Sequence, residues 1–349
     1  MDILAKIESI KYTPIMAKKD LNNYYVEDLE KALSRDGTFL LTLDNNNKIA
    51  VSWWVSAKRT RSYPYARIYD SLGFKGKQTT IIPICKDEGQ GGDRDFLQYD
   101  TVSLMSLLQV YVIIGYYLIA IKNTSYSNKI TNQRFDVRHI YGELEALSSY
   151  RSDALHWNLE QLKKVPSIAE KSLKAYKEIS KKLGVQMHSE KNFEIRINEL
   201  MKGVDEFLNF SRKLAEKAQH REMLTIQPKE NVEIGKAKIT IKNYLGGYYY
   251  FTADEAKIVG KDVLLIEAKH TKTADLPSLS DIKDGLLKMI LFTNLQDVTI
   301  NNRIFNSIPI LKLTTGQPIT KSEELKLKPL IQESSINRFR ILLNKSFIT

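Results

Sequence analysis

The sequence contains very little cysteine and histidine for its length. Its 349 residues include one cysteine, Cys85, and five histidines that are scattered along the chain. A single cysteine excludes an intrachain disulfide and a zinc site built from several cysteines, and the histidines lack the spacing of metal-ligand pairs. Disulfide-stabilised and cysteine–zinc proteins are therefore excluded as classes.

The sequence also lacks an obvious leader and a clear membrane helix. Residues 1–4 contain no basic region that leads into an apolar one, so we expect no signal peptide. Residues 101–121 carry no charge and are long enough to cross a bilayer, but Gln109 and Gly115 interrupt the apolar run. We expect instead a buried helix over 96–108 followed by a buried strand, in a cytoplasmic protein without a membrane segment.

What the sequence does have is a surplus of positive charge. The formal net charge is +11, while a hydrophobic content of 43% and a charged content of 27% are ordinary for a globular protein. A surplus of this size favours a polyanionic partner, most simply nucleic acid, because basic side chains displace the counterions of phosphates.

The length is sufficient for two or three domains. A polar connector at residues 122–130 is the best candidate for a boundary. We therefore expect an N-terminal α/β region over 1–130, which could serve DNA recognition. A second region, over 131–349, would contain a helical segment followed by a catalytic segment at about 232–313.

Local patterns predict several individual elements. Apolar runs on either side of an Asp-Asn-Asn-Asn turn predict a hairpin, and apolar residues at helical spacing predict amphipathic helices. Ser280 is a candidate N-cap. The resulting predictions are a hairpin over 38–55, successive helices between 141 and 183, and helices over 20–33, 193–218, 281–291 and 336–343.

Two predicted strands in the last third of the chain carry charged residues at their ends. The apolar run 263–266 ends in Glu267, Ala268 and Lys269. Because side chains alternate along a strand, Glu267 and Lys269 point the same way. Asp254 follows another strand-like aromatic run. If the two strands pair, Asp254 meets Glu267 and Lys269 at one edge of the sheet.

This combination of side chains has a chemical use. Two neighbouring carboxylates bind Mg²⁺, a hard cation that takes oxygen ligands. The metal lowers the pKa of a bound water and neutralises charge on a phosphodiester. A lysine beside the carboxylates can hold the attacking water or take its proton, because a partly desolvated lysine loses its own proton more easily.

The pattern resembles the signature of the PD-(D/E)XK nucleases. Asp254 and the tripeptide Glu267-Ala268-Lys269 at the end of an apolar strand match that signature, although Ala253 stands where proline often precedes the aspartate. The resemblance covers roughly the last third of the chain. The length and the basic charge are most similar to those of a type II restriction endonuclease.

The resemblance implies a fold, a cofactor and partners. The fold would be of the α/β (α+β) class, with a mixed central β-sheet flanked by helices in a restriction-endonuclease-like core. Asp254 and Glu267 would bind Mg²⁺, and Lys269 would be catalytic. The protein would act as a homodimer on double-stranded DNA, within a restriction–modification system. Glu255 is a rival for the role of Asp254, and a helix acid such as Glu206 or Glu216 could join the site.

Two stretches are candidates for contacts with DNA. In residues 56–77 basic side chains alternate with tyrosines, and two further polar residues follow the Glu-Ala-Lys tripeptide. Basic and tyrosine side chains contact phosphates, and arginine can also read guanine. The alternative is a solvated loop whose tyrosines pack into the core. The candidate contacts are Lys58, Arg59, Arg61, Tyr63, Arg67, His270 and Lys272.

A Gly-rich loop offers a rival metal site. Its acids are Asp87, Glu88, Asp93 and Asp95. The alternative is a flexible loop in which one of these acids caps the next helix. The loop has no Gly-Lys-Ser/Thr ending, which excludes a P-loop.

The leading hypothesis from the sequence is a Mg²⁺-dependent, site-specific deoxyribonuclease of type II restriction type. One alternative is a non-catalytic DNA-binding module with a degenerate nuclease fold. Another is a nuclease of DNA repair or junction resolution. The simplest alternative is that Glu267 and Lys269 form an ordinary surface ion pair and that Asp254 is an ordinary turn residue.

Overall fold

The computed structural model of the protein describes residues 1–58, 62–189, 191, 192, 195, 235–242, 248–316 and 321–348. The chain divides into two compact units, which we call the terminal unit and the central unit. The terminal unit comprises Met1–Lys19 and Leu214–Thr349, and the central unit comprises Asp20–Lys213. Both units combine helices with sheets, so the mixed α/β class predicted from the sequence is confirmed.

The central unit is built on a five-stranded sheet with the order β2-β3-β4-β5-β8. Strands β3 and β4 form the predicted antiparallel hairpin, and the remaining neighbours pair in parallel. Parallel strands are buried on both faces. Accordingly β8 is almost wholly apolar, and β5 is buried from its third residue onward although two of the buried residues are threonines. The strands are β2 (Asn23–Tyr25), β3 (Thr38–Thr42), β4 (Lys48–Trp53), β5 (Lys77–Pro83) and β8 (Tyr111–Gly115).

Seven helical segments are described in the central unit. They are the 3₁₀ turn η1 (Val26–Asp28), α1 (Leu29–Arg35), α2 (Pro64–Ser71), α3 (Tyr99–Leu107), α4 (Val137–Ser149), α5 (Ala154–Lys163) and α6 (Val165–Leu183). The carboxylates of Asp136 and Asp153 accept backbone N–H groups at the starts of α4 and α5, as aspartate N-caps do. The successive helices predicted between 141 and 183 are confirmed.

Two short hairpins complete the central unit. Strands β6 (Cys85–Asp87) and β7 (Arg94–Phe96) form one, and β9 (Tyr117–Lys122) and β10 (Ile130–Phe135) form the other. The uncharged run 101–121 therefore forms most of α3, then β8 and most of β9, which confirms the predicted buried helix followed by a buried strand. Among the described helices, none has the length and hydrophobicity that a bilayer span requires.

The expected domain boundary near residue 130 falls inside the central unit. The reason is packing: helices α4 and α5, which follow that position, lie against strand β8, which precedes it. The polar connector 122–130 is the turn of the hairpin between β9 and β10 rather than a linker. The helix expected over 20–33 also begins later, because residues 23–25 pair with β3 as a strand.

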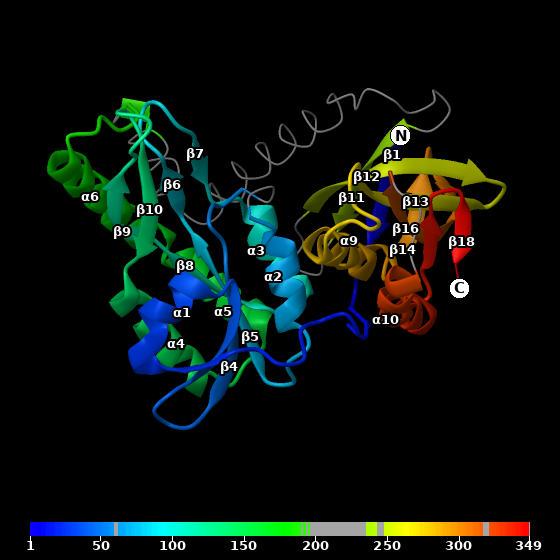
Figure 1. Ribbon diagram of the computed structural model, residues 1–349, viewed down its shortest axis with the longest axis horizontal. Helices are drawn as coiled ribbons and strands as arrows, with labels where there is room; N and C mark the ends of the chain where they lie inside the picture. Colours follow the sequence, from blue (N-terminus) through cyan, green and yellow to red (C-terminus); the bar gives the residue numbers. More distant parts are fainter. Residues whose placement is uncertain are drawn as a thin grey trace. The chain divides into compact units, whose positions relative to one another are not determined.

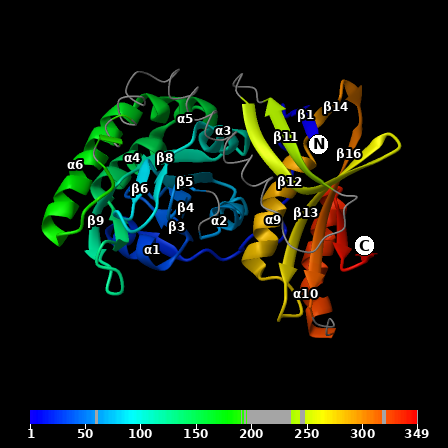
Figure 2. The same cartoon turned by 90° about the horizontal axis from the view of Figure 1, so that it is seen from above.

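The terminal unit is built on a nine-stranded mixed sheet with the order β15-β14-β1-β11-β12-β13-β16-β17-β18. Figure 2 shows β11, β12 and β13 side by side in this sheet. The strands are β1 (Asp2–Lys6), β11 (Gly235–Lys242), β12 (Tyr248–Val259), β13 (Asp262–Thr271), β14 (Gln296–Ile300), β15 (Arg303–Ile304), β16 (Asn306–Thr315), β17 (Arg340–Leu343) and β18 (Ser346–Ile348).

The central part of this sheet changes from antiparallel to parallel pairing. Strands β11, β12 and β13 form an antiparallel meander, and β13, β16 and β17 are mutually parallel neighbours. Parallel neighbours need a crossover connection. Helix α9 (Leu279–Phe292) lies in the connection from β13 to β16, and α10 (Lys321–Asn337) lies in the connection from β16 to β17. Helix α9 packs on β13 and β16 (Figure 1), and Leu286, Met289 and Ile290 are among its buried residues.

Two further helix predictions have different outcomes. The basic helix expected over 336–343 is wrong: α10 ends at Asn337, and Arg338 adopts a left-handed conformation with φ of 59°. The chain then forms β17, in which Ile341 is fully buried beside β16. The amphipathic helix expected over 193–218 lies almost wholly outside the described residues, as do Glu206 and Glu216.

The start of α9 is fixed by Ser278 rather than by Ser280. The Ser278 hydroxyl accepts the backbone N–H of Asp281 at 3.1 Å and donates to the Asp281 carboxylate at 2.6 Å. We expect Ser278→Ala to lower the free energy of unfolding by about 1 kcal/mol, the usual effect of losing an N-cap. Ser280→Ala is the matched control and should have almost no effect. Urea unfolding followed by circular dichroism tests this, and equal losses in both variants would contradict the assignment.

Candidate active site

Strands β12 and β13 bring the three predicted residues together. The two strands pair in register from Glu255 opposite Ile266 to the turn. One residue beyond that ladder, the Asp254 carboxylate accepts the backbone N–H of Ala268 at 2.8 Å. The Nζ atom of Lys269 lies 2.9 Å from Oε1 of Glu267. Asp254, Glu267 and Lys269 therefore meet as the alternation of the strands predicts, and their chemical roles stay predictions.

A second lysine, which the sequence analysis did not identify, completes the pairing of Glu267. Nζ of Lys288, on α9, lies 2.7 Å from Oε2 of Glu267. The same ammonium lies over the ring of Phe251, 4.9 Å from its centre. Glu267 is only 1% exposed, and an unpaired buried carboxylate would cost several kcal/mol. Lys269 and Lys288 together supply the compensation, one for each carboxylate oxygen.

Helix α9 also contributes a third carboxylate. Asp284 lies one helical turn before Lys288, and its Oδ2 atom is 2.7 Å from Nζ of Lys269. The cluster thus contains three carboxylates and two ammonium groups. Gly285 permits this arrangement, because a Cβ atom there would lie 3.3 Å from Cε of Lys269 and 2.7 Å from a methyl of Leu311. We call Asp254, Glu267, Lys269, Asp284 and Lys288 the carboxylate–lysine cluster.

The two carboxyls that would bind metal differ in proton affinity. Burial alone would raise the pKa of Asp254, but the charge of Lys288 and the hydrogen bond from Ala268 hold it below its ordinary value. Burial raises the pKa of Glu267 to about 7, against the opposing effect of the Lys288 charge. Near neutral pH, Asp254 is therefore ionised, whereas Glu267 is partly protonated.

Lys269 is held in its charged form. Burial would lower its pKa, but the carboxylates of Glu267 and Asp284 outweigh burial and raise the pKa above its ordinary value. The two carboxylates therefore oppose the effect of desolvation that the sequence predicts for this lysine. In its charged form Lys269 can orient a water or neutralise a phosphate, and its role as a base stays a prediction.

Glu255, the rival for the role of Asp254, lies on the other face of the sheet. It is buried, and its Oε1 atom is 2.5 Å from Nζ of Lys312 on β16. Lys312 is in register with Ala268, whose side chain points away from the face of Glu267 and Lys269. Glu255 is thus separated from the carboxylate–lysine cluster by the sheet itself.

His270 and Lys272 follow Lys269 at the end of β13. Both are exposed, and the His270 ring nitrogen Nδ1 is 2.9 Å from the hydroxyl of Thr314. Their position beyond the cluster is consistent with the predicted contact to a DNA backbone, which stays a prediction.

The stretch 56–77 does not present all its basic residues to solvent. Arg67, on α2, lies over the ring of Trp53 at 4.5 Å and donates to its carbonyl at 2.8 Å. This guanidinium is used inside the unit, so the DNA contact predicted for Arg67 is not supported. Tyr65 and Tyr69 are buried, as the core alternative expected.

The remaining candidates of that stretch have mixed outcomes. The Tyr63 side chain precedes α2 and is 48% exposed. Lys58 is about half exposed and pairs with the Asp95 carboxylate at 3.0 Å. Arg59 and Arg61 lie outside the described residues. Tyr63 and Lys58 therefore remain the described candidates for contacts from the central unit.

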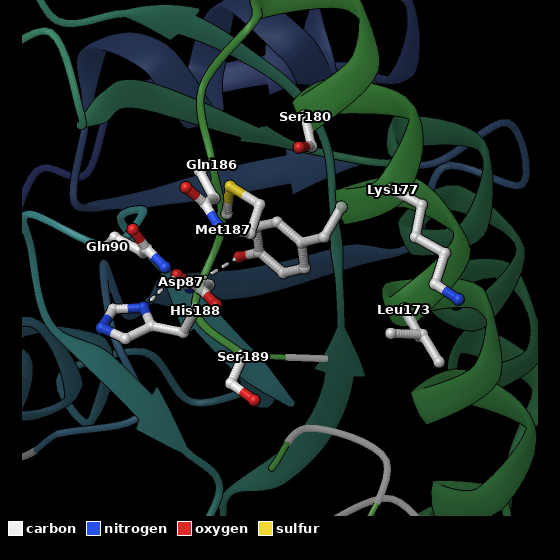
Figure 3. Close-up of a pocket in the computed structure, with 10 residues that line it drawn as sticks. Asp87, Gln90, Leu173, Lys177, Ser180, Gln186, Met187, His188 and Ser189 are labelled. Atoms are coloured by element: carbon white, nitrogen blue, oxygen red, sulfur yellow. Dashed lines mark hydrogen bonds and ion pairs between the residues drawn. The ribbon is translucent and has the colours of Figure 1, made fainter. Parts of the chain in front are cut away.

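The acids of the Gly-rich loop turn to separate partners. Asp87 is buried and lies 2.7 Å from Nδ1 of His188, beside a pocket (Figure 3). Glu88 pairs with Lys86 at 2.9 Å, whereas Asp95 pairs with Lys58. These three acids are directed to different partners instead of toward one another, so this loop is a weaker candidate metal site than the cluster.

Comparison with known proteins adds no further information. The chain matches no protein-family model, no curated protein and no solved structure.

Asp254 and Glu267 supply neighbouring oxygen donors of the kind that a divalent cation such as Mg²⁺ takes, and the ammonium of Lys288 lies 2.7 Å from Glu267. Within the described residues, no group of three or more His, Cys, Asp or Glu side chains is arranged to hold a metal. Two carboxylates are nevertheless sufficient for Mg²⁺, which usually takes one or two together with waters and substrate phosphates.

Asp284 and Lys288 carry a signal that the sequence analysis missed. They stand four positions apart, in a helix that is otherwise largely apolar after Asp284. Residues at this spacing lie on the same helix face. Two opposite charges on the buried face of a helix need partners on the sheet. The predicted strand that carries Glu267 and Lys269 offers one partner of each sign.

The raised pKa of Glu267 predicts a pH dependence of stability. Between its ordinary value of 4.5 and its folded value of about 7, the folded protein holds a proton that the unfolded chain releases. The free energy of unfolding of the wild type should therefore fall as pH rises through this range, by up to about 3 kcal/mol. Glu267→Gln should lack this fall. Urea titrations at pH 4.5 to 8 test the difference, and parallel curves would contradict it.

Proposed function

We propose that the protein is a Mg²⁺-dependent endonuclease that cleaves double-stranded DNA at specific sequences, in the manner of a type II restriction enzyme. The observation that carries this proposal is the meeting of Asp254 with Glu267 and Lys269 within two neighbouring strands, just beyond the point where the ladder between them stops. The mixed sheet with its β13–α9–β16 crossover supports a restriction-endonuclease-like core.

The residues of the site have separate roles in this proposal. Asp254 and Glu267 would hold the Mg²⁺ ion, which when bound lowers the pKa of water and neutralises phosphate charge. Lys269, kept cationic by Glu267 and Asp284, orients the attacking water and stabilises negative charge on the phosphate. Asp284 fixes the position of the Lys269 ammonium.

The charge of the chain supports DNA as the substrate. A net charge of +11 attracts a polyanion and speeds its association. His270 and Lys272 would contact the backbone beside the site, and Lys58 and Tyr63 are separate candidates for DNA contacts on the central unit. Cleavage of both strands would require two sites, which a homodimer would supply.

A second candidate function is a DNA-binding module without nuclease activity. The observation that favours it is Lys288, because both oxygens of Glu267 already have a lysine partner. An ion cluster with a purely structural role would have the same pairing. This candidate predicts salt-dependent binding to DNA and no cleavage with any divalent metal.

Cleavage assays on long double-stranded DNA with Mg²⁺ test the leading proposal. We expect Glu267→Gln and Lys269→Ala to lower the cleavage rate by about 100-fold or more, as for the loss of one preorganised electrostatic group. Glu255→Gln is the matched control, because it neutralises a buried, lysine-paired glutamate on the other face of the sheet. It should retain most of the activity.

The outcomes of this assay separate the candidates. Fragments of fixed length support a restriction enzyme, whereas cleavage confined to branched DNA supports a nuclease of repair or junction resolution. Binding without cleavage supports the DNA-binding module. Equal cleavage by the wild type and both site variants would remove the carboxylate–lysine cluster from the mechanism.

The salt dependence of DNA affinity tests the contact at the strand end. If Lys272 neutralises one phosphate, Lys272→Ala should reduce the slope of log affinity against log salt concentration by about 1. Lys257→Ala removes an exposed lysine from the other end of the same strand pair and should leave the slope unchanged. Fluorescence anisotropy at several salt concentrations measures both, and identical slopes in all three proteins would exclude this contact.

A further inference from the structure

The site that would receive a metal ion already contains a positive charge from the protein. The Lys288 ammonium lies 2.7 Å from Oε2 of Glu267, and the Lys288 side chain is 15% exposed. Oε1 of the same carboxylate is 2.9 Å from Lys269. Lys269 has an additional partner in Asp284 at 2.7 Å. Of the two lysines, Lys269 is thus anchored from two sides.

We propose that Lys288 is a built-in cation that occupies the place of the metal on Glu267 and leaves it when a divalent ion binds. The inference rests on the proposed function, because it assumes that Asp254 and Glu267 form a metal site. It adds a step which that function does not require: the exchange of one cation for another at the same carboxylate oxygen.

Charge is the first reason for the exchange. A divalent ion bound between Asp254 and Glu267 would lie within a few ångström of an ammonium that contacts the same oxygen. Two cations at this distance repel strongly in a buried site, where water screens them little. Lys269 keeps Asp284 as a carboxylate partner outside the metal pair. The carboxylates that act on Lys288 are Glu267 and Asp254, the two that the metal would take, so Lys288 is the lysine that moves.

The flexible side chain of Lys288 is the second reason to expect that it exchanges with a metal ion. Its four-carbon stem is flexible, and it extends from α9 toward the sheet between Glu267 and Phe251. Before the metal binds, the ammonium keeps the buried Glu267 carboxylate compensated and in place. The metal site is therefore assembled in advance, and metal affinity is reduced by the need to displace Lys288.

The chain offers a matched control for this lysine. Lys312 pairs with the buried Glu255 at 2.5 Å on the other face of the same sheet. The side chains of Lys288 and Lys312 are 15% and 17% exposed. Both are lysines that compensate a buried glutamate, but only Lys288 does so at the carboxylate pair.

The first experiment measures the affinity of the full-length protein for Mn²⁺ by electron paramagnetic resonance, at pH 8.5 and without DNA. We expect Lys288→Met to bind Mn²⁺ at least tenfold more tightly than the wild type. Lys312→Met should bind like the wild type. Unchanged or weaker binding by Lys288→Met would overturn the exchange.

The second experiment uses the wild type alone and does not depend on how the variants fold. Amine acylation followed by mass spectrometry measures the accessibility of each lysine. Lys288 should be protected without Mn²⁺ and should react several-fold faster at saturating Mn²⁺, while Lys312 should not change. Equal labelling of Lys288 with and without Mn²⁺ would overturn the exchange.

The two experiments separate this inference from the proposed function. If neither the wild type nor Lys288→Met binds Mn²⁺, the metal site itself is wrong and the exchange is wrong with it. If the wild type binds Mn²⁺ while the labelling of Lys288 stays constant, only the exchange is wrong and the proposed nuclease site stands.

Discussion

The burial of one carboxylate, that of Glu267, is the constraint on which the terminal unit depends. A carboxylate that is 1% exposed must be compensated by positive charge or stay protonated. One compensating lysine, Lys269, comes from the same strand, and the other, Lys288, comes from α9. The position of α9 on the sheet is therefore set by charge as well as by its apolar residues.

The same interactions explain why the cluster is suited to chemistry. Asp254 and Glu267 come from neighbouring strands, so the rigid sheet determines their separation. Lys269 is restrained by Glu267 and Asp284, which holds its charge at a fixed position. Preorganised charge of this kind stabilises a transition state without a cost of reorientation. A structural ion cluster on the surface would not need to bury its central carboxylate.

The sequence was sufficient to predict the meeting of Asp254, Glu267 and Lys269, because alternation along a strand and one turn between neighbours determine it. It also predicted the buried helix and strand within 101–121. These features depend on contacts between residues that are close in the sequence. The cap at Ser278 was misassigned by two residues, which is the usual uncertainty at helix ends.

Features that depend on distant contacts could not be predicted in this way. Residues 2–6 pair in parallel with 238–242, and no local pattern indicates that partner. Arg67 lies in a basic, tyrosine-rich stretch that is typical of DNA contacts, but its guanidinium packs on the ring of Trp53. The central unit continues past the polar connector at 122–130, because α4 and α5 pack on β8. The polar composition of the connector does not reveal this packing.

The most direct test of the central claim is to locate a bound metal. Crystals of the full-length protein soaked in Mn²⁺ would be measured at a wavelength where manganese scatters anomalously. The account predicts an anomalous peak within coordination distance of carboxylate oxygens from both Asp254 and Glu267. No peak at that position under saturating Mn²⁺, or a peak only beside Asp87 in the central unit, would contradict it.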